Sequence, residues 1–274
     1  MPFFVWGKSD YKYTPVTEAE AIEHLYDTKR IEDRFFLFEN VCLKTLDNQT
    51  NQYFRFVVIT SSLMPKPYQM RLMELAKTRP YLKIVIETRN DLNEIIRNEL
   101  SQFYDDFSVK PADTVQFRLD DDDGVASGYI AALKLHSRRF LPPNGIISYP
   151  NGLVLFAEDG AFRAFRAHQP MTAQGLARKD PNRTILEMAH FRVSANLPTL
   201  SFPKIPMYFQ VYHNTNDTHA ARDKNITKLM KTSPNFGSEG HEEMIQKILN
   251  VHFSGFDPRE KLTQHYAIQK KDPK

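Results

Sequence analysis

The sequence predicts an α/β fold in which helices flank a mostly parallel mixed sheet, followed by an antiparallel second half that contains a hairpin. Before residue 114, short β-branched runs alternate with segments whose apolar residues recur every three or four positions, which is typical of βαβ units. After residue 140, short strands follow one another closely. The chain has 274 residues, 41% hydrophobic and 25% charged, so we expect a single domain over 1–274 with a sizeable core.

Capping signals and periodicity give the elements of the first half. Thr17-Glu-Ala-Glu20 has the form of a capping box, Pro67 suits the first turn of a helix, and Asn90 or Asp91 suits an N-cap. In chain order we expect a strand at 3–6, helices over 17–27 and 35–46, a strand at 54–60, a helix after Pro67, a strand at 81–86, a helix from residue 90 or 91, a strand at 114–119 and a helix over 126–138.

In the second half the clearest signal is Pro150-Asn151-Gly152, because Asn-Gly accepts positive φ at both positions of a hairpin turn. We therefore expect a hairpin between strands at 146–149 and 153–156. The remaining expected elements are a third antiparallel strand at 162–165, a loop with a short helix over 170–180, strands at 184–188 and 207–212, and helices over 238–249 and from 257.

Four consecutive carboxylates, Asp120 to Asp123, end the expected strand at 114–119. Such a run is either a solvated acidic turn or a site for a divalent cation, since buried like charges need counter-charge. The strand before it and the helix after it favour the cation, because ligands gather beyond the carboxyl ends of strands in open α/β sheets. Alternation leaves two registers open, Asp120 with Asp122 or Asp121 with Asp123, and either needs the chain to turn, which Gly124 permits.

Several other sites are excluded by inspection. The chain has no Gly-x-Gly-x-x-Gly, no Gly-Lys-Ser/Thr phosphate loop and no Gly-x-Ser-x-Gly elbow. His241-Glu242 lacks the second histidine of a zinc helix. A calcium loop with its glycine at Gly124 would put Leu119 and Ile130 where carboxylates are required.

Composition limits the partners and the compartment. A net charge of +3 does not indicate nucleic-acid binding, and the late lysines favour a solvated basic surface with at most peripheral membrane contact. There is no run of about 18 apolar residues, and the first residues are too short for a signal sequence, so a cytoplasmic location is the default expectation. Cys42, the single cysteine, lies among apolar residues and is expected to be buried and unreactive.

A series of segments occurs in an order typical of one family. They are Phe38, Glu39, Cys42 and Leu43 at a helix start, Gln49-Thr50, Leu63-Met-Pro65, Arg118-Leu-Asp-Asp-Asp-Asp123, Tyr149-Pro-Asn-Gly152 and Gln210-Val-Tyr-His-Asn-Thr-Asn216. Over roughly residues 30 to 216 the chain resembles the bacterial putative rhamnosyltransferase family. The segment 117–124 is also similar to the Asp-x-Asp segment of glycosyltransferases with the GT-A fold.

This resemblance implies a GT-A type, nucleotide-sugar-binding fold with a donor half over 1–140 and an acceptor half over 141–274. It implies transfer of a hexosyl group, rhamnose being the candidate, from a nucleotide-sugar donor to a glycan or lipid-linked acceptor, with Mn²⁺ or Mg²⁺. The metal ligands that it implies are Asp120, Asp122, Asp123 and His213, although His213 also suits a structural role.

Further site residues are proposed with less support from motifs. The candidate substrate-binding residues are Gln49, Thr60, Arg118, Asp120 and Asp121. In many such enzymes the corresponding strand ends in an aspartate that contacts the nucleotide, whereas here Ile59 is followed by Thr60. Arg118 equally suits a structural ion pair.

An inverting transfer needs a general base within hydrogen-bond reach of the acceptor hydroxyl. Glu187, Asp159 and Asp217 are available, and we favour Glu187 together with His190, which closes the same apolar run.

Two alternative functions remain open from the sequence. A metal-dependent phosphohydrolase or nucleotidyltransferase also places paired carboxylates after a strand, and it would release phosphate or pyrophosphate without a sugar acceptor. A catalytically degenerate carbohydrate-binding protein would bind sugar or nucleotide without turnover. The lack of the strand-end aspartate before Thr60 keeps this second alternative open.

Overall fold

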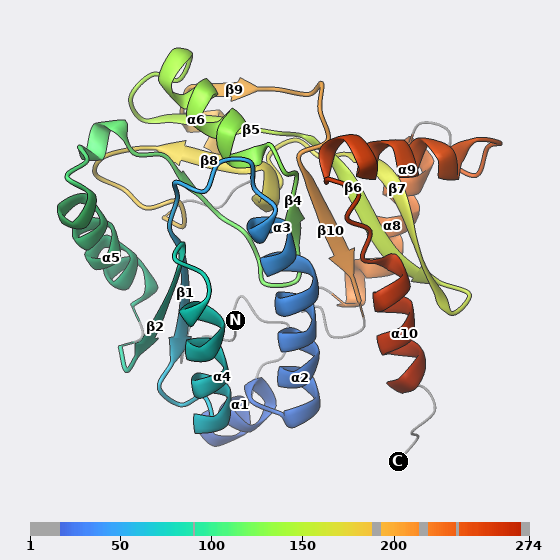
Figure 1. The fold of residues 1–274 in the computed structure, drawn as a ribbon, viewed down its shortest axis with the longest axis horizontal. Helices are drawn as coiled ribbons and strands as arrows, with labels where there is room; N and C mark the ends of the chain where they lie inside the picture. Colours follow the sequence, from blue (N-terminus) through green and yellow to red (C-terminus); the bar gives the residue numbers. More distant parts are fainter. Residues whose placement is uncertain (1–16, 90, 188–192, 214–218, 234–235, 270–274) are drawn as a thin grey trace.

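The structure is a computed structural model that describes residues 17–89, 91–187, 193–213, 219–233 and 236–269 (Figure 1). The helices are α1 (Glu18–Leu25), α2 (Thr28–Leu37), the π-helix η1 (Phe38–Cys42), α3 (Leu43–Asp47), α4 (Lys66–Lys77), α5 (Leu92–Phe107), α6 (Tyr129–Arg139), α7 (Val193–Asn196), α8 (His219–Thr232), α9 (His241–His252) and α10 (Arg259–Gln269), with 3₁₀ turns η2 (Pro111–Asp113) and η3 (Ala173–Gly175). The strands are β1 (Phe56–Ser61), β2 (Leu82–Glu87), β3 (Gln116–Phe117), β4 (Gly124–Val125), β5 (Gly145–Ser148), β6 (Asn151–Glu158), β7 (Ala161–His168), β8 (Leu176–Lys179), β9 (Thr199–Ser201) and β10 (Tyr208–Tyr212).

The strands form three sheets, ordered β1-β2, β4-β10-β6-β7 and β3-β8-β5-β9. Of the seven pairings among the described strands, three are parallel and four antiparallel. The predicted mixed α/β fold with flanking helices is therefore confirmed. The parallel share is smaller than expected because β3 pairs antiparallel with β8 of the second half.

Most of the expected helices form for the expected reasons. Thr17 accepts from the Glu20 backbone and Glu20 accepts in return, which completes the capping box of α1. Asp91 caps α5, and its carboxylate accepts from two backbone N–H groups of the first turn. The expected strand at 3–6 lies outside the described residues.

The predicted hairpin at Pro150-Asn151-Gly152 is wrong. Asn151 and Gly152 lie inside β6, while β5 belongs to another sheet, so the chain crosses between sheets at this point. Gly152 serves close packing instead, since a Cβ there would lie 2.5 Å from the ring of Tyr208 on the neighbouring strand. The actual hairpin joins β6 to β7 through Asp159 and Gly160, whose φ angles of 51° and 83° fit a two-residue turn.

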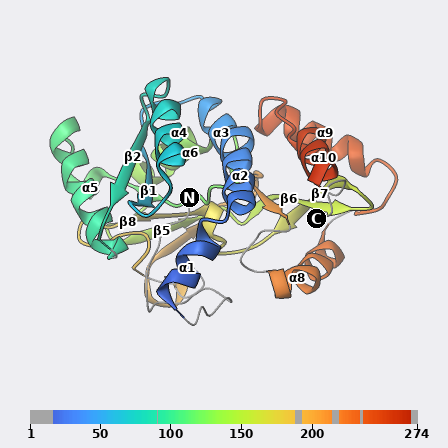
Figure 2. The same cartoon turned by 90° about the horizontal axis from the view of Figure 1, so that it is seen from below.

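Sheet β4-β10-β6-β7 is buried on both faces, with α9 and α10 on one side and α8 on the other (Figure 2). Alternate residues of β6 serve the two cores. Leu153 and Leu155 pack in the main core with Leu249 of α9, whereas Val154 and Phe156 pack with Ile226 of α8. Because its alternate side chains are apolar on both faces, β6 packs against helices on both sides of the sheet. His213 follows directly after β10, the neighbouring strand of this sheet.

Residues 184–187 do not form the strand expected at 184–188, and Met188 lies outside the described residues. Their backbone groups are used by side chains: the Thr184 carbonyl accepts from Arg178 Nη1 at 3.0 Å, and the Ile185 N–H donates to Gln116 Oε1 at 3.0 Å. Instead a short strand, β8, occupies part of the expected loop over 170–180. Arg178 on β8 is buried and donates to both the Asp180 carboxylate and the Thr184 carbonyl, so it fixes the conformation of residues 180–184.

Within the described residues, no helix combines the length and apolar character needed to cross a bilayer.

Candidate functional site

The four aspartates form a tight turn that connects two sheets. They lie between β3 and β4, and the Asp123 N–H donates to the Asp120 carbonyl at 3.2 Å. The turn therefore comes before Gly124 and not at it. Gly124 is needed for close packing, because a Cβ there would lie 2.2 Å from the Phe209 ring of β10. The carboxylates are thus fixed at the junction of β3, β4 and β10.

Asp121 is neutralised by Arg34 of α2. The Arg34 Nη1 donates to Asp121 Oδ1, and both side chains are largely buried, at 13% and 5% exposed. Burial alone would raise the pKa of Asp121, but the charge of Arg34, its hydrogen bond and further positive charge together outweigh burial and lower the pKa below its ordinary value. Asp121 is therefore an ionised carboxylate held against a guanidinium.

Asp122 faces His213, which follows β10. His213 Nε2 lies 3.0 Å from Asp122 Oδ2, and Arg34 Nη1 lies 3.6 Å from the same oxygen. Burial opposes ionisation, yet the hydrogen bond from His213 and the charge of Arg34 lower the pKa of Asp122. The structure thus brings together the aspartate and the histidine that the sequence assigned to one metal shell.

Asp123 points into the protein and is held by it on both oxygens. Its Oδ1 accepts from the Val211 N–H at 3.0 Å, and its Oδ2 accepts from the side-chain amide of Gln174. Only 2% of the residue is exposed. Burial raises the pKa of Asp123 well above its ordinary value, and the charges of Asp122 and Asp120 raise it further. Asp123 therefore anchors the turn to β10.

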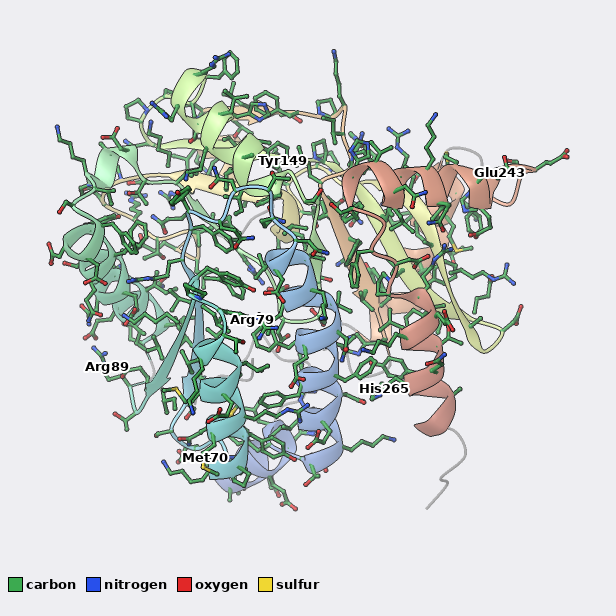
Figure 3. The ribbon with its side chains drawn as sticks, viewed as in Figure 1. Met70, Arg79, Arg89, Tyr149, Glu243 and His265 are labelled. Atoms are coloured by element: carbon green, nitrogen blue, oxygen red, sulfur yellow. The ribbon has the colours of Figure 1, made fainter. Side chains whose placement is uncertain are left out.

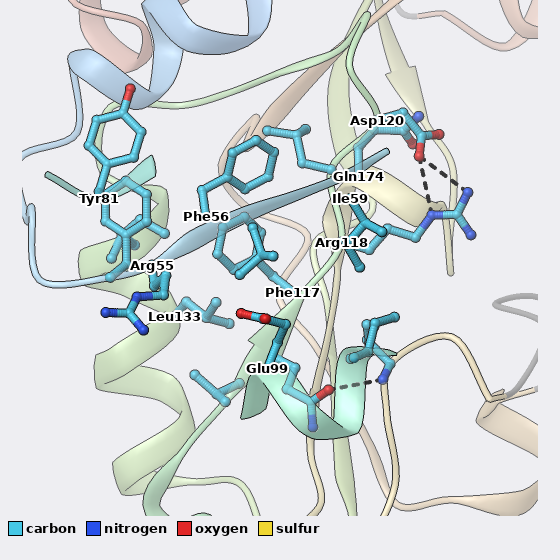
Figure 4. A pocket seen from close by; sticks show the side chains of 18 of the residues that line it. Arg55, Phe56, Ile59, Tyr81, Glu99, Phe117, Arg118, Asp120, Leu133 and Gln174 are labelled. Carbon is cyan, nitrogen blue, oxygen red and sulfur yellow. Dashed lines mark hydrogen bonds and ion pairs between the residues drawn. The ribbon is translucent and has the colours of Figure 1, made fainter. Parts of the chain in front are cut away.

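Asp120 is the most exposed of the four and lies at the edge of a cleft of about 1310 Å³. Its carboxylate accepts from Arg118, whose Nη2 is 3.2 Å from Asp120 Oδ1 (Figure 4). The cleft is bounded by β1, α5, α6 and the acidic turn, and Phe56 and Phe117 line its middle. A ligand in this cleft would meet the acidic turn at one end and apolar side chains along the rest.

A divalent cation was predicted at Asp120, Asp122, Asp123 and His213, and the geometry fits part of that set. Asp122 Oδ2 and His213 Nε2 are 3.0 Å apart and share a hydrogen bond, so a cation would have to replace the proton between them. Their separation would then suit adjacent ligands of an octahedral ion with bonds of about 2.1 Å. Asp123 fits less well, because both of its oxygens already accept hydrogen bonds within the protein. In the described part of the chain, no three His, Cys, Asp or Glu side chains are grouped as a complete metal-binding set.

The other predicted site residues lie away from the acidic turn or outside the described chain. Gln49 is buried. Its amide nitrogen donates to the carbonyls of Thr45 and Ala126, and its amide oxygen accepts from the Ile130 N–H, so it connects α3 to the start of α6.

Thr60 is fully buried near Met64. Glu187 Oε1 accepts from Arg97 at 2.7 Å and from the Thr184 N–H at 3.2 Å. His190 lies outside the described residues, and the general base stays a prediction.

Two side chains of the site, Arg34 and Gln174, were not identified from the sequence. Arg34 is 87 residues from Asp121 along the chain, and Gln174 is 51 residues from Asp123. Cys42 is fully buried as predicted, and burial raises the pKa of its thiol well above the ordinary value, so the thiol stays protonated. No local motif marks the arginine or the glutamine, because both act through contacts between distant segments.

Replacing Asp123 by asparagine is expected to stabilise the metal-free protein above neutral pH by roughly 1–3 kcal/mol. The raised pKa of Asp123 means that wild-type stability is complete below about pH 4 and falls as pH rises through the folded-state pKa. The amide does not titrate, so its advantage grows with pH. Urea unfolding between pH 4 and pH 9 in EDTA measures this effect. Asp106→Asn is the control, because Asp106 is an exposed carboxylate paired with Arg55 and lies outside the acidic turn. An advantage that shrinks with rising pH would contradict the assignment.

The chain is similar to known proteins in two comparisons. Residues 3–225 match the model of a family described as putative rhamnosyl transferase. A solved structure of S. aureus TarS, residues 1–349 in complex with UDP, is similar over 81% of this chain and 70% of that chain, with 12% sequence identity and a TM-score of 0.37. No curated protein matches the chain.

Proposed function

The chain belongs to the putative rhamnosyl transferase family, and on that premise we propose that it transfers a hexosyl group, with rhamnose as the first candidate, from a nucleotide-sugar donor to a hydroxyl group of a glycan or lipid-linked acceptor. The observation that carries the proposal is the Asp122–His213 pair, backed by Arg34, beside a cleft large enough for a nucleotide sugar. The GT-A type of donor site is part of the same proposal.

In this proposal Asp122 and His213 would be the protein ligands of a Mn²⁺ or Mg²⁺ ion. Asp120, which lies at the cleft edge against Arg118, would add a further oxygen only if its side chain turned toward them. When bound, such an ion acts as a Lewis acid that stabilises negative charge on a departing nucleoside diphosphate. The chain's own charges serve the same end. Arg34 keeps Asp121 and Asp122 ionised, and Arg118, 37% exposed beside Asp120, can turn its guanidinium to a phosphate group.

The aromatic middle of the cleft would exclude water around the donor. Phe56 and Phe117 stack with centroids 6.3 Å apart, and Phe117 packs edge-on against the buried Tyr129. A dry cleft strengthens the interaction of the charged groups at its end with the diphosphate. It also protects a reactive sugar from hydrolysis, which a transferase requires and a hydrolase does not.

The test combines ligand binding with product analysis. Thermal unfolding with a panel of nucleoside diphosphates and their sugars, with and without Mn²⁺, should reveal one that stabilises the protein; a ligand at about 100 times its Kd adds about 2.7 kcal/mol. With that donor and a panel of glycan and lipid-linked acceptors, we expect a glycosylated product and free nucleoside diphosphate.

The other outcomes separate the alternatives. Release of phosphate or pyrophosphate without any sugar acceptor would favour a phosphohydrolase or nucleotidyltransferase. Binding without turnover across the whole panel would favour a carbohydrate-binding protein. Transfer that is unchanged in EDTA would contradict the metal requirement while leaving the transferase assignment in place.

A further inference from the structure

Helix α10 packs beside the acidic turn although it lies outside residues 3–225, the segment that matches the family. It runs next to α2 and covers one face of the sheet that contains β7 and β10 (Figures 1 and 2). Two consecutive side chains of this helix face these elements. Tyr266 contacts His213, which itself contacts Asp122, and His265 contacts Asp33, the residue before Arg34 on α2.

Tyr266 packs against His213, the partner of Asp122. The two rings are stacked, with centroids 6.2 Å apart and planes inclined by 28°. Phe162 of β7 also packs against the Tyr266 ring, at 5.6 Å. His213 is 1% exposed, so its imidazole cannot rotate without displacing these neighbours. The ring of Tyr266 therefore helps to hold His213 Nε2 toward Asp122.

His265 fixes the helix that carries Arg34. Its Nε2 lies 2.9 Å from Oδ1 of Asp33, a carboxylate on α2 that is 1% exposed. The imidazole of His265, labelled in Figure 3, also stacks on Phe36 of α2, with centroids 3.6 Å apart and planes inclined by 5°. Asp33 directly precedes Arg34 on α2. Besides the buried core residues of α2, this contact holds the helix next to the residue that reaches Asp121.

We infer that α10 is part of the functional site, with Tyr266 and His265 as positioning residues that orient His213 and the Arg34-bearing helix. The effect of these residues on sugar transfer rests on the proposed function. Their effect on the orientation of His213 does not, because that orientation can be measured without any substrate. Neither residue touches the cleft, so both act through other side chains.

The ring of Tyr266, and not its hydroxyl group, carries this role. The residue is 9% exposed, and within the described chain its Oη has no hydrogen-bond partner. A buried hydroxyl group without a partner contributes no stabilising bond, so its removal costs little or is favourable. Tyr266→Phe should keep the stacking on His213, whereas Tyr266→Leu fills much of the space but removes the aromatic face.

The experiment compares Tyr266→Phe and Tyr266→Leu in the full chain by ¹⁵N NMR of the histidine side chains, with the His213 signals assigned through His213→Gln. Leu262→Ala is the control for loss of packing on α10, because Leu262 lies one turn earlier on the helix and is also buried, at 1% exposed against 9% for Tyr266. We expect wild-type His213 signals in the phenylalanine variant and in the control, and shifted or broadened signals in the leucine variant. Transfer should fall at least tenfold in Tyr266→Leu and less than threefold in Tyr266→Phe.

His265→Gln tests the second contact, since it removes the stacking on Phe36 but retains a donor for Asp33. We expect reduced turnover with little change in the KM for the donor. Unchanged His213 signals and unchanged transfer in Tyr266→Leu would overturn the inference, as would an equal change in Leu262→Ala. If the wild-type protein transfers no sugar, the proposed function fails, and the His213 signals alone decide the role of Tyr266.

Discussion

Replacing Asp122 by alanine is expected to lower the rate of sugar transfer by roughly a hundredfold to a thousandfold, the loss typical of removing one group that stabilises transition-state charge. The variant loses one of the two atoms that fit a divalent cation, and it leaves His213 and Arg34 without the carboxylate they share. If the proposed metal site is correct, both the response to added Mn²⁺ and the rate should fall, because the same carboxylate would bind the metal and orient His213.

Steady-state transfer with a titration of Mn²⁺ measures this effect. Asp113→Ala is the control, since Asp113 also lines the cleft but lies before β3 and outside the acidic turn. Asp122→Asn separates two contributions: the amide retains the shape and a hydrogen bond to His213 but not the charge. Metal-independent transfer at the wild-type rate in Asp122→Ala would remove Asp122 from the mechanism.

Replacing Asp180 by alanine is expected to destabilise the fold by about 3–5 kcal/mol, the usual cost of leaving a buried charge without its partner. Arg178 is 1% exposed, and its Nε lies 3.1 Å from Asp180 Oδ2. Without the carboxylate, the guanidinium retains its bond to the Thr184 carbonyl but not its counter-charge. Because β8 pairs with both β3 and β5, the loss should weaken the strand that leads into the acidic turn.

Urea denaturation of Asp180→Ala against wild type gives the change in unfolding free energy. Arg178→Met combined with Asp180→Leu is the informative second variant, because replacing both charges with apolar groups is expected to restore much of the lost stability. Asp106→Ala is a surface control: this carboxylate is 52% exposed in its ion pair with Arg55, and its loss should cost less than about 1 kcal/mol. A loss in Asp180→Ala no larger than in the surface control would contradict the prediction.

Local sequence signals predicted elements whose causes are themselves local. The capping box at Thr17, the cap at Asp91 and the period of three and four along α2, η1 and α3 each concern residues within one or two turns, so the sequence alone was sufficient. The hairpin at Pro150-Asn151-Gly152 failed for the opposite reason. Its glycine is required by the ring of Tyr208, more than fifty residues later, and a turn motif cannot reveal such a contact.

The sequence by itself determined that four carboxylates follow shortly after a strand and that His213 follows a late strand. The expected strand at 114–119 is shorter, since β3 covers only Gln116–Phe117, and the tertiary structure decided what each carboxylate does. The spacing allowed two pairs of aspartates as metal ligands. In the fold Asp121 instead pairs with Arg34, Asp122 with His213, and Asp123 accepts from the backbone N–H of Val211. A run of identical charges has no local preference among partners. Its members become different only when helices and strands from distant parts of the chain surround each of them with different charges and different degrees of burial.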